Sequence, residues 1–182
     1  MRRMLFVSAV VSMYGCATSG SGSLTPATNP DVRIVTPQSE QVVATGSSVV
    51  EGTATVAAPI DKVWGVLTPT YDSLGIPLTA IDPASHALGN GGMIVHRKLG
   101  KARLSEYINC GNSQGGPSAD TYEVNLSVVT RLAPAPSAGT IVTTVVNAAG
   151  KPASLSGDYI PCGTTGGLET RLVRLIEAQL RQ

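Results

Sequence analysis

Two helical patterns, one after the first strand and one at the C-terminus, constrain the fold of this chain more than any other feature. The apolar residues of the first pattern recur at the spacing of one buried helical stripe: Ile60, Val63, Trp64 and Leu67. Pro59 suits the first helical position, and Asp61 faces the positive end of the helix dipole. Thr68 before Pro69 predicts a bend, with Thr68 as a new N-cap, and Gly75 predicts the end of the helix.

The second helical pattern forms the C-terminus. Its apolar stripe consists of Leu168, Leu172, Leu175, Ile176 and Leu180. The charged residues fall mostly outside the stripe, at Glu169, Arg171, Arg174, Glu177 and Arg181. Thr165 is the candidate cap at its beginning. The chain therefore ends in an amphipathic helix with one face available to a core.

Strand patterns occupy most of the remaining sequence. Runs of β-favouring residues lie at 49–56, 78–81, 86–88, 93–99, 122–132 and 140–147. The last two runs flank a proline-containing turn and should pair antiparallel, with 148–152 ending the second and an extended piece following at 159–162. The sequence thus predicts an α+β fold over residues 49–182, a two-layer arrangement of an antiparallel sheet, a bent helix after the first main strand and a C-terminal helix.

Composition supports one domain without nucleic-acid binding. The chain has 182 residues, of which 42% are hydrophobic and only 4% aromatic, so the core must consist mainly of aliphatic side chains. Its formal net charge of +1 lacks the basic excess of a nucleic-acid-binding domain. We expect no nucleic-acid partner.

The N-terminus has the layout of an export signal. Two arginines precede an apolar run, which is shorter than the roughly 20 residues of a transmembrane helix, and Gly15 precedes Cys16. Residues 13–16, Met-Tyr-Gly-Cys, resemble the lipobox of bacterial lipoproteins, which implies a signal peptide at 1–15 and a lipid on Cys16. An ordinary secretion signal with a cysteine near the cut is the alternative.

A linker separates the predicted lipid from the predicted domain. Residues 17–30 carry no charge and a single leucine, a composition that cannot bury enough surface to fold. We therefore predict a tether over residues 16–48 that includes short strand pieces. Ala17 follows the predicted lipid cysteine, at the position where lipoproteins retained at the inner membrane have Asp. In this respect the chain resembles lipoproteins that are not retained there. This implies a protein of the cell envelope on the periplasmic face of the outer membrane.

Two cysteines, Cys110 and Cys162, lie within the predicted domain. In an exported protein such a pair predicts a disulfide. Zinc is one alternative, although neither cysteine has a CxxC partner. A Cys110 nucleophile with His96 as base is another, and it requires a free thiolate.

Residues 54–67, ATVAAPIDKVWGVL, resemble the opening of the helix-grip superfamily, the START-like or polyketide-cyclase-like (SRPBCC) proteins. In that family a strand ends in a small residue and Pro, and a helix carrying Val-Trp follows. The resemblance extends over residues 49–182 and implies an apolar ligand held between the C-terminal helix and a curved sheet. A helix-grip domain behind an N-terminal lipid is also similar in architecture to the C lipoprotein of the β-barrel assembly machine.

Two groups of residues are candidate binding residues. By the resemblance, Trp64, Tyr71 and Tyr122 line a ligand cavity; the alternative is that they fill the core. The one cluster of cations could contact anionic lipid or a partner, or form the solvated rim of a hairpin. Its members are Arg97, Lys98, Lys101 and Arg103.

These patterns favour a non-catalytic, lipid-anchored envelope protein that binds a protein partner or an apolar ligand. A purely structural envelope lipoprotein and an enzyme of the START-like superfamily are the alternatives. The chain shows no convergent triad, paired carboxylates or metal-ligand spacing, so we predict no catalytic residue, no metal and no cofactor.

Overall fold

The computed structural model describes residues 34–36, 39–41, 51–154 and 157–182. The predicted signal peptide, Cys16 and most of the predicted tether lie outside these residues, as do the first two residues of the predicted strand at 49–56. Within the tether range, β1 (Ile34–Thr36) and β2 (Ser39–Gln41) pair as a short antiparallel hairpin.

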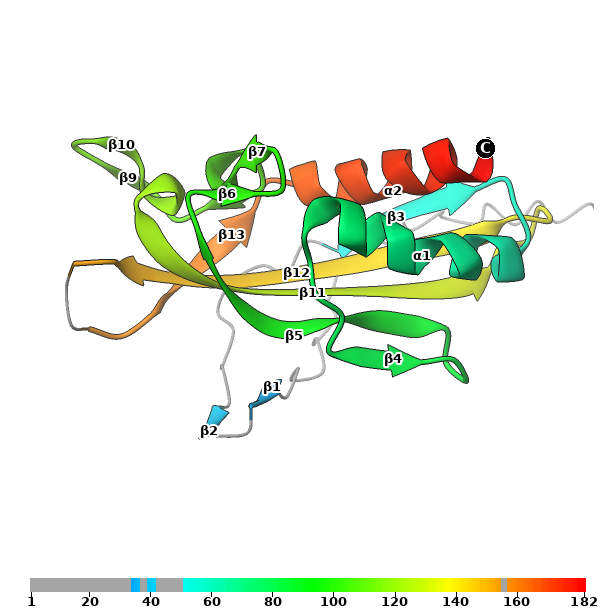
Figure 1. The fold of residues 1–182 in the computed structure, drawn as a ribbon, viewed down its shortest axis with the longest axis horizontal. Coiled ribbons are helices and arrows are strands. Elements are labelled where there is room, and N and C mark those ends of the chain that lie inside the picture. The colour runs from blue at the N-terminus through cyan, green and yellow to red at the C-terminus, as the bar shows by residue number, and fades with distance from the viewer. Residues whose placement is uncertain (1–33, 37–38, 42–50, 155–156) are drawn as a thin grey trace, which may run out of the picture. The chain divides into compact units, whose positions relative to one another are not determined.

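The described part of the chain from residue 51 onward forms an antiparallel sheet with two helices (Figure 1). The sheet has the strand order β4-β5-β11-β12-β13-β8, and β3 also pairs with β12. Its strands are β3 (Glu51–Val56), β4 (Ala80–Asp82), β5 (Ala87–His96), β8 (Ile108–Asn109), β11 (Tyr122–Pro134), β12 (Thr140–Pro152) and β13 (Ile160–Thr164). The helices are α1 (Ile60–Leu74), directly after β3, and α2 (Gly167–Leu180).

Both helices lie on the same face of the sheet in Figure 1, and the core lies between them and the long strands. Seven helix residues have 0% exposure, five of them from the predicted stripes: Val63, Leu67, Thr70, Tyr71, Leu168, Leu172 and Ile176. The other stripe residues, Ile60, Trp64, Leu175 and Leu180, are only partly buried. The facing residues of the long strands are also buried: Val124, Leu126, Val128, Val142 and Val146. The predicted α+β, two-layer fold class is confirmed.

Short elements fill the connection between β5 and β11. They are β6 (Lys98–Leu99), β7 (Ala102–Arg103), η1 (Leu104–Glu106), β9 (Asn112–Ser113), β10 (Gly116–Pro117) and η2 (Ser118–Asp120). The β6–β7 pair forms a small antiparallel hairpin that the sequence patterns did not separate from β5. Among the described helices, neither has the length and hydropathy needed to cross a bilayer.

The first helix differs from the prediction in its interior. It continues from Ile60 to Leu74 without a second N-cap, so the cap predicted at Thr68 is wrong. Thr68, Pro69 and the glycine one turn earlier, Gly65, are all exposed, and a Cβ on that glycine would meet no neighbour. Pro69 therefore lies on the exposed side of the helix, where the carbonyl that loses its hydrogen bond to the proline can be solvated.

Two strands, β5 and β12, are longer than the sequence predicted. A break was expected at Gly91–Gly92, but β5 is continuous, and a register shift against β11 absorbs the extra residue. Likewise, β12 continues to Pro152 because Ala148–Pro152 pairs with the first residues of β11. The helix boundaries differ by one residue: Pro59 is the N-cap of α1, and Gly166 rather than Thr165 is the N-cap of α2.

Candidate functional site

A polar hollow of about 790 Å³ lies at the N-terminal half of α2. It is bounded by the end of α1, the β6–β7 hairpin, the end of η1 and the exposed side of α2. We call it the basic hollow. Its lining residues are Ser73, Leu74, Lys101, Ala102, Glu106, Tyr107, Thr165, Gly166, Gly167, Thr170, Arg171, Arg174 and Leu175.

The β6–β7 hairpin is held against the end of α1 by close backbone packing. Gly100 has φ +58°, and a Cβ at this position would lie 3.2 Å from the Leu74 carbonyl oxygen. Glycine suits this position because it tolerates both the left-handed conformation and the close approach of the Leu74 carbonyl. The amide of Leu104 donates to the Arg97 carbonyl at 2.8 Å, and Leu104 is fully buried. These contacts place Lys101 at the rim of the hollow.

The beginning of α2 is tied to η1 by hydrogen bonds from one threonine. The amide of Thr165 donates to the Tyr107 carbonyl at 2.8 Å, and its hydroxyl donates to the Glu106 carbonyl at 2.7 Å. Gly167 has no room for a side chain, because a Cβ would lie 2.4 Å from the Glu106 carbonyl oxygen. The first turn of α2 is therefore fixed against the floor of the basic hollow.

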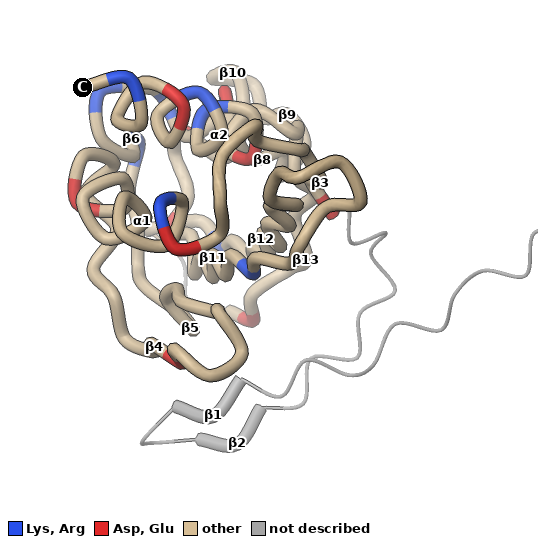
Figure 2. The backbone as a smooth tube through the Cα atoms, turned by 90° about the vertical axis from the view of Figure 1, so that its right-hand side faces the viewer, with Lys and Arg blue, Asp and Glu red and all other residues tan. Residues whose placement is uncertain are grey.

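Three cations and one carboxylate line the basic hollow. Lys101 comes from the hairpin, Arg171 and Arg174 come from α2, and Glu106 comes from η1. Figure 2 shows Lys and Arg at α2 and beside β6. The positive end of the α2 dipole acts in the same direction. The hollow therefore has the charge to receive an anionic group.

The pKa of the Tyr107 phenol responds to burial and to the charges around the hollow. Burial raises the pKa of its phenol, while the Arg171 charge lowers it and the Glu106 charge raises it further. No described acidic side chain lies within 4.0 Å of the charged nitrogens of Lys101, Arg171 or Arg174, the one described ion pair being Lys151–Glu123. The sequence identified Lys101 but missed both arginines, whose only signal was their place on the outer side of the C-terminal helical pattern.

The other predicted cations belong to the same hairpin but not to the hollow. Arg97, Lys98 and Arg103 are exposed at the hairpin rim, and the lining of the hollow does not include them. Of the predicted cluster, the structure thus brings only Lys101 together with the α2 arginines.

The three aromatic residues predicted at a ligand cavity lie in different surroundings. Tyr71 has no exposure, and its hydroxyl is 2.8 Å from the Thr130 hydroxyl, which lies 3.0 Å from that of Thr144. Trp64 is half-buried and meets the ring of His86 edge-on, with 5.7 Å between ring centroids. None of the three, Tyr122 included, lines the basic hollow.

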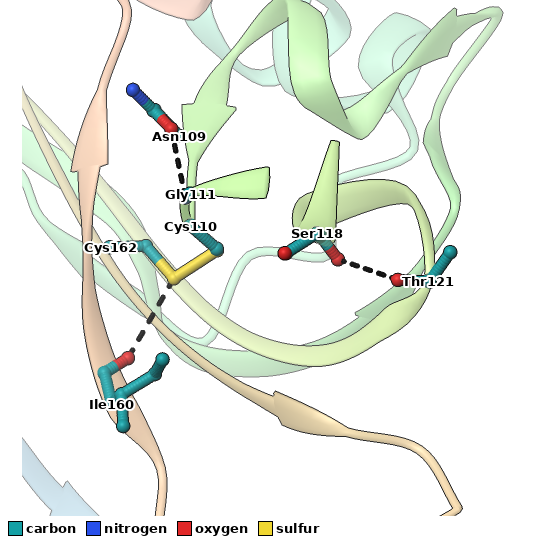
Figure 3. Close-up of a disulfide and its surroundings, with 7 residues drawn as sticks. All are labelled: Asn109, Cys110, Gly111, Ser118, Thr121, Ile160 and Cys162. Atoms are coloured by element: carbon teal, nitrogen blue, oxygen red, sulfur yellow. Dashed lines mark hydrogen bonds between the residues drawn. A yellow bond between two sulfur atoms is a disulfide. The ribbon is translucent and has the colours of Figure 1, made fainter. Parts of the chain in front are cut away.

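Tyr122 lies instead near Gly150, as does the disulfide between Cys110 and Cys162. Figure 3 shows this disulfide. The structure has the pairing that the sequence predicts, with the two Cα atoms 4.4 Å apart. The bond packs on Gly150 of β12, where a Cβ would lie 3.2 Å from each sulfur and 3.1 Å from the Tyr122 ring. A glycine in β12 is therefore what allows the bridge to lie directly over the sheet.

No group of three or more His, Cys, Asp and Glu side chains within the described ranges is arranged to hold a metal ion. In comparisons with known proteins, no family model and no curated protein matches this chain. The function therefore has to be inferred from the geometry of the site.

Proposed function

We propose that this protein is a non-catalytic, lipid-anchored envelope protein whose folded domain binds an acidic segment of a partner protein through the basic hollow. The observation that carries the proposal is the convergence of Lys101, Arg171 and Arg174 from two elements far apart in the sequence. Such a concave, basic surface matches a carboxylate-rich partner in charge and speeds its association.

The domain is proposed to be of helix-grip type, as the sequence resemblance implies. The element order supports this, since one helix follows the first strand of the sheet and a second helix ends the chain on the same face. The predicted apolar ligand has less support than a partner protein. The space between helices and sheet is occupied by fully buried side chains, among them Tyr71, Leu67 and Leu172.

Binding of hexaglutamate tests the partner site directly. In the labelled full-length protein, held in detergent micelles, the peptide should shift the amide signals of Gly166, Gly167 and Lys101 saturably, and salt should weaken the effect. Replacing Lys101 and Arg171 together by alanine should weaken binding by about tenfold or more. Arg131→Ala, an exposed arginine of β11, is the matched control.

Two results would contradict the partner site. One is the absence of saturable shifts at millimolar peptide. The other is an equal loss in the Arg131→Ala control, which would indicate general charge attraction. Vesicles containing anionic phosphatidylglycerol form a second arm: binding to these vesicles without binding to hexaglutamate would replace the acidic partner with a lipid surface.

The anchor is proposed to be a lipid on Cys16, at the periplasmic face of the outer membrane. Its support is the charged start, the apolar run and Gly15 in the sequence. Cys16→Ser should therefore move the protein from the membrane fraction to the soluble fraction or leave it unprocessed. Mass spectrometry that finds Met1 retained, or an unmodified Cys16 in membranes, would refute the anchor.

A further inference from the structure

A second hollow lies between α2 and β3 at the edge of the sheet. We call it the strand–helix groove, and its volume is about 400 Å³. One wall is β3 and the other is the first half of α2, which run next to each other in Figure 1. The lining residues are Gly52, Thr53, Ala54, Gly166, Glu169, Thr170, Val173 and Arg174.

The outer edge of β3 has no strand partner among the described residues. Among the strands that the structure describes, β3 pairs only with β12, through Glu51 to Val56. Alternate residues of an edge strand direct their N–H and C=O groups away from the sheet, where another strand can pair with them. The groove is therefore bounded by an edge that can accept an added strand.

The helix wall carries a buried carboxylate, Glu169, with one of its two oxygens unpaired among the described residues. Glu169 is only 4% exposed, and its Oε1 accepts a hydrogen bond from the Thr164 hydroxyl at 2.8 Å. No described group donates to its Oε2. Buried polar atoms are nearly always hydrogen-bonded, so an unpaired carboxylate oxygen beside a groove indicates a missing donor.

The fit between Glu169 and Gly52 shows that the two walls meet closely. A Cβ on Gly52 would lie 2.4 Å from the Cβ of Glu169, so only glycine allows the carboxylate side chain to cross the strand here. Glu51 adds a second, exposed acid at the same end of β3. These two acids outnumber Arg174, the one cation in the groove lining, which favours a cationic donor over an anionic one.

We propose that the strand–helix groove binds an extended, lysine-containing segment of a partner polypeptide, which pairs with β3 as an added strand and donates to Glu169. Backbone hydrogen bonds to β3 supply the affinity, and the lysine ammonium supplies the specificity. The occupant is a polypeptide because only a repeating chain of donors and acceptors matches the edge of a strand. This site is separate from the basic hollow, although the two share Gly166, Thr170 and Arg174 in their linings.

A synthetic strand tests the pairing without altering the protein. The probe is an acetylated, amidated heptapeptide, VTVKVTV, added to labelled full-length protein in detergent micelles. It should shift the amide signals of Glu51–Val56 saturably and slow hydrogen exchange at alternate residues of β3. N-methylation of alternate peptide amides should abolish binding in one alternate set and leave it nearly unchanged in the other, because only one set faces β3.

The role of the carboxylate is tested by Glu169→Gln, which keeps an acceptor for Thr164 but removes the charge. It should weaken binding of the lysine peptide by about tenfold, and leave binding of a norleucine peptide of the same length nearly unchanged. Glu177→Gln, on the same helix outside the groove lining, is the matched control and should bind like the original protein. The fluorescence of Trp64 reports whether each variant is folded.

Three outcomes would overturn the proposal. They are unchanged β3 signals at millimolar peptide, equal binding of both N-methylated sets, and an equal preference for lysine in the Glu169→Gln variant. Shifts confined to Lys101 and Arg171 would also overturn it, because they would place the peptide in the basic hollow. Failure here leaves the hexaglutamate result untouched, since the two probes carry opposite charge.

Discussion

Removing the disulfide is expected to cost a substantial part of the stability that a domain of this size has. The bond joins residues 52 positions apart, and in the chain-entropy model a loop of this length corresponds to about 4 kcal/mol. The perturbation is the double variant Cys110→Ala with Cys162→Ala. Alanine is preferred to serine because Cys162 is only 6% exposed, and a buried hydroxyl would need its own hydrogen-bond partner.

The structure also predicts which part of the domain loses stability first when the disulfide is removed. β8 and β13 are paired through only two residue pairs, Gly163 with Asn109 and Thr164 with Ile108. The disulfide therefore reinforces a short ladder that positions the hydrogen bonds from Thr165 to η1. Without it, amide exchange should accelerate first in residues 107–112 and 160–165, and the basic hollow should lose its fixed floor.

Urea unfolding at pH 7, followed by far-UV circular dichroism and Trp64 fluorescence, measures the effect. The double variant should lose about 4 kcal/mol of unfolding free energy, with a fall in Tm of roughly 15 °C for a domain of this length. Original protein treated with a reductant should match the variant, and Cys16→Ala should retain the full stability. A loss below about 1 kcal/mol, or two reactive thiols in the native protein, would refute the reasoning.

Two further substitutions test the packing of the sheet. Burial raises the pKa of Tyr71 to about 12. Because folding favours the protonated phenol, stability should be complete below the unfolded pKa of about 10 and fall as pH rises toward 12. Tyr71→Phe should cost about 1 kcal/mol at pH 7 and make the alkaline fall of the urea midpoint shallower; an equally steep fall would contradict this assignment. Gly150→Ala should cost about 1 to 3 kcal/mol in thermal unfolding, because a Cβ there presses on both sulfurs, whereas Gly163→Ala, with open space around its Cβ, should cost much less; equal losses would contradict this packing.

The sequence was sufficient where structure depends on neighbours along the chain. The helical stripe of α1 and its end at Gly75 follow from spacing and from the left-handed conformation, φ 71°, that glycine adopts there. The alternation in β11 and the branched residues of β12 predicted their antiparallel pairing in the same way. Even so, local signals at Gly91 and Gly92 indicated a break, because they carry no information about the partner strand that bridges it.

The residues of the candidate sites were harder to predict from the sequence than the helices and strands were. Lys101 stood out as part of a charge cluster, but Arg171 and Arg174 had only the ordinary place of charges on the outside of an amphipathic helix. Glu169 likewise had the pattern of an exposed acid in a first helical turn. It is buried because α2 packs against Gly52, a residue more than a hundred positions earlier.

By itself, the sequence determined the two helices, the long strands, the fold class and the cysteine pairing. These depend on backbone periodicity, the preferences of individual residues and the number of cysteines in the domain. Only the tertiary structure decided which polar faces meet. Hydrophobic burial fixes how helices lie on a sheet, and the charges outside the stripes are carried to wherever that packing places them. The basic hollow and the strand–helix groove exist for this reason, both bordered by Gly166, Thr170 and Arg174, and neither can be derived from spacing along the chain.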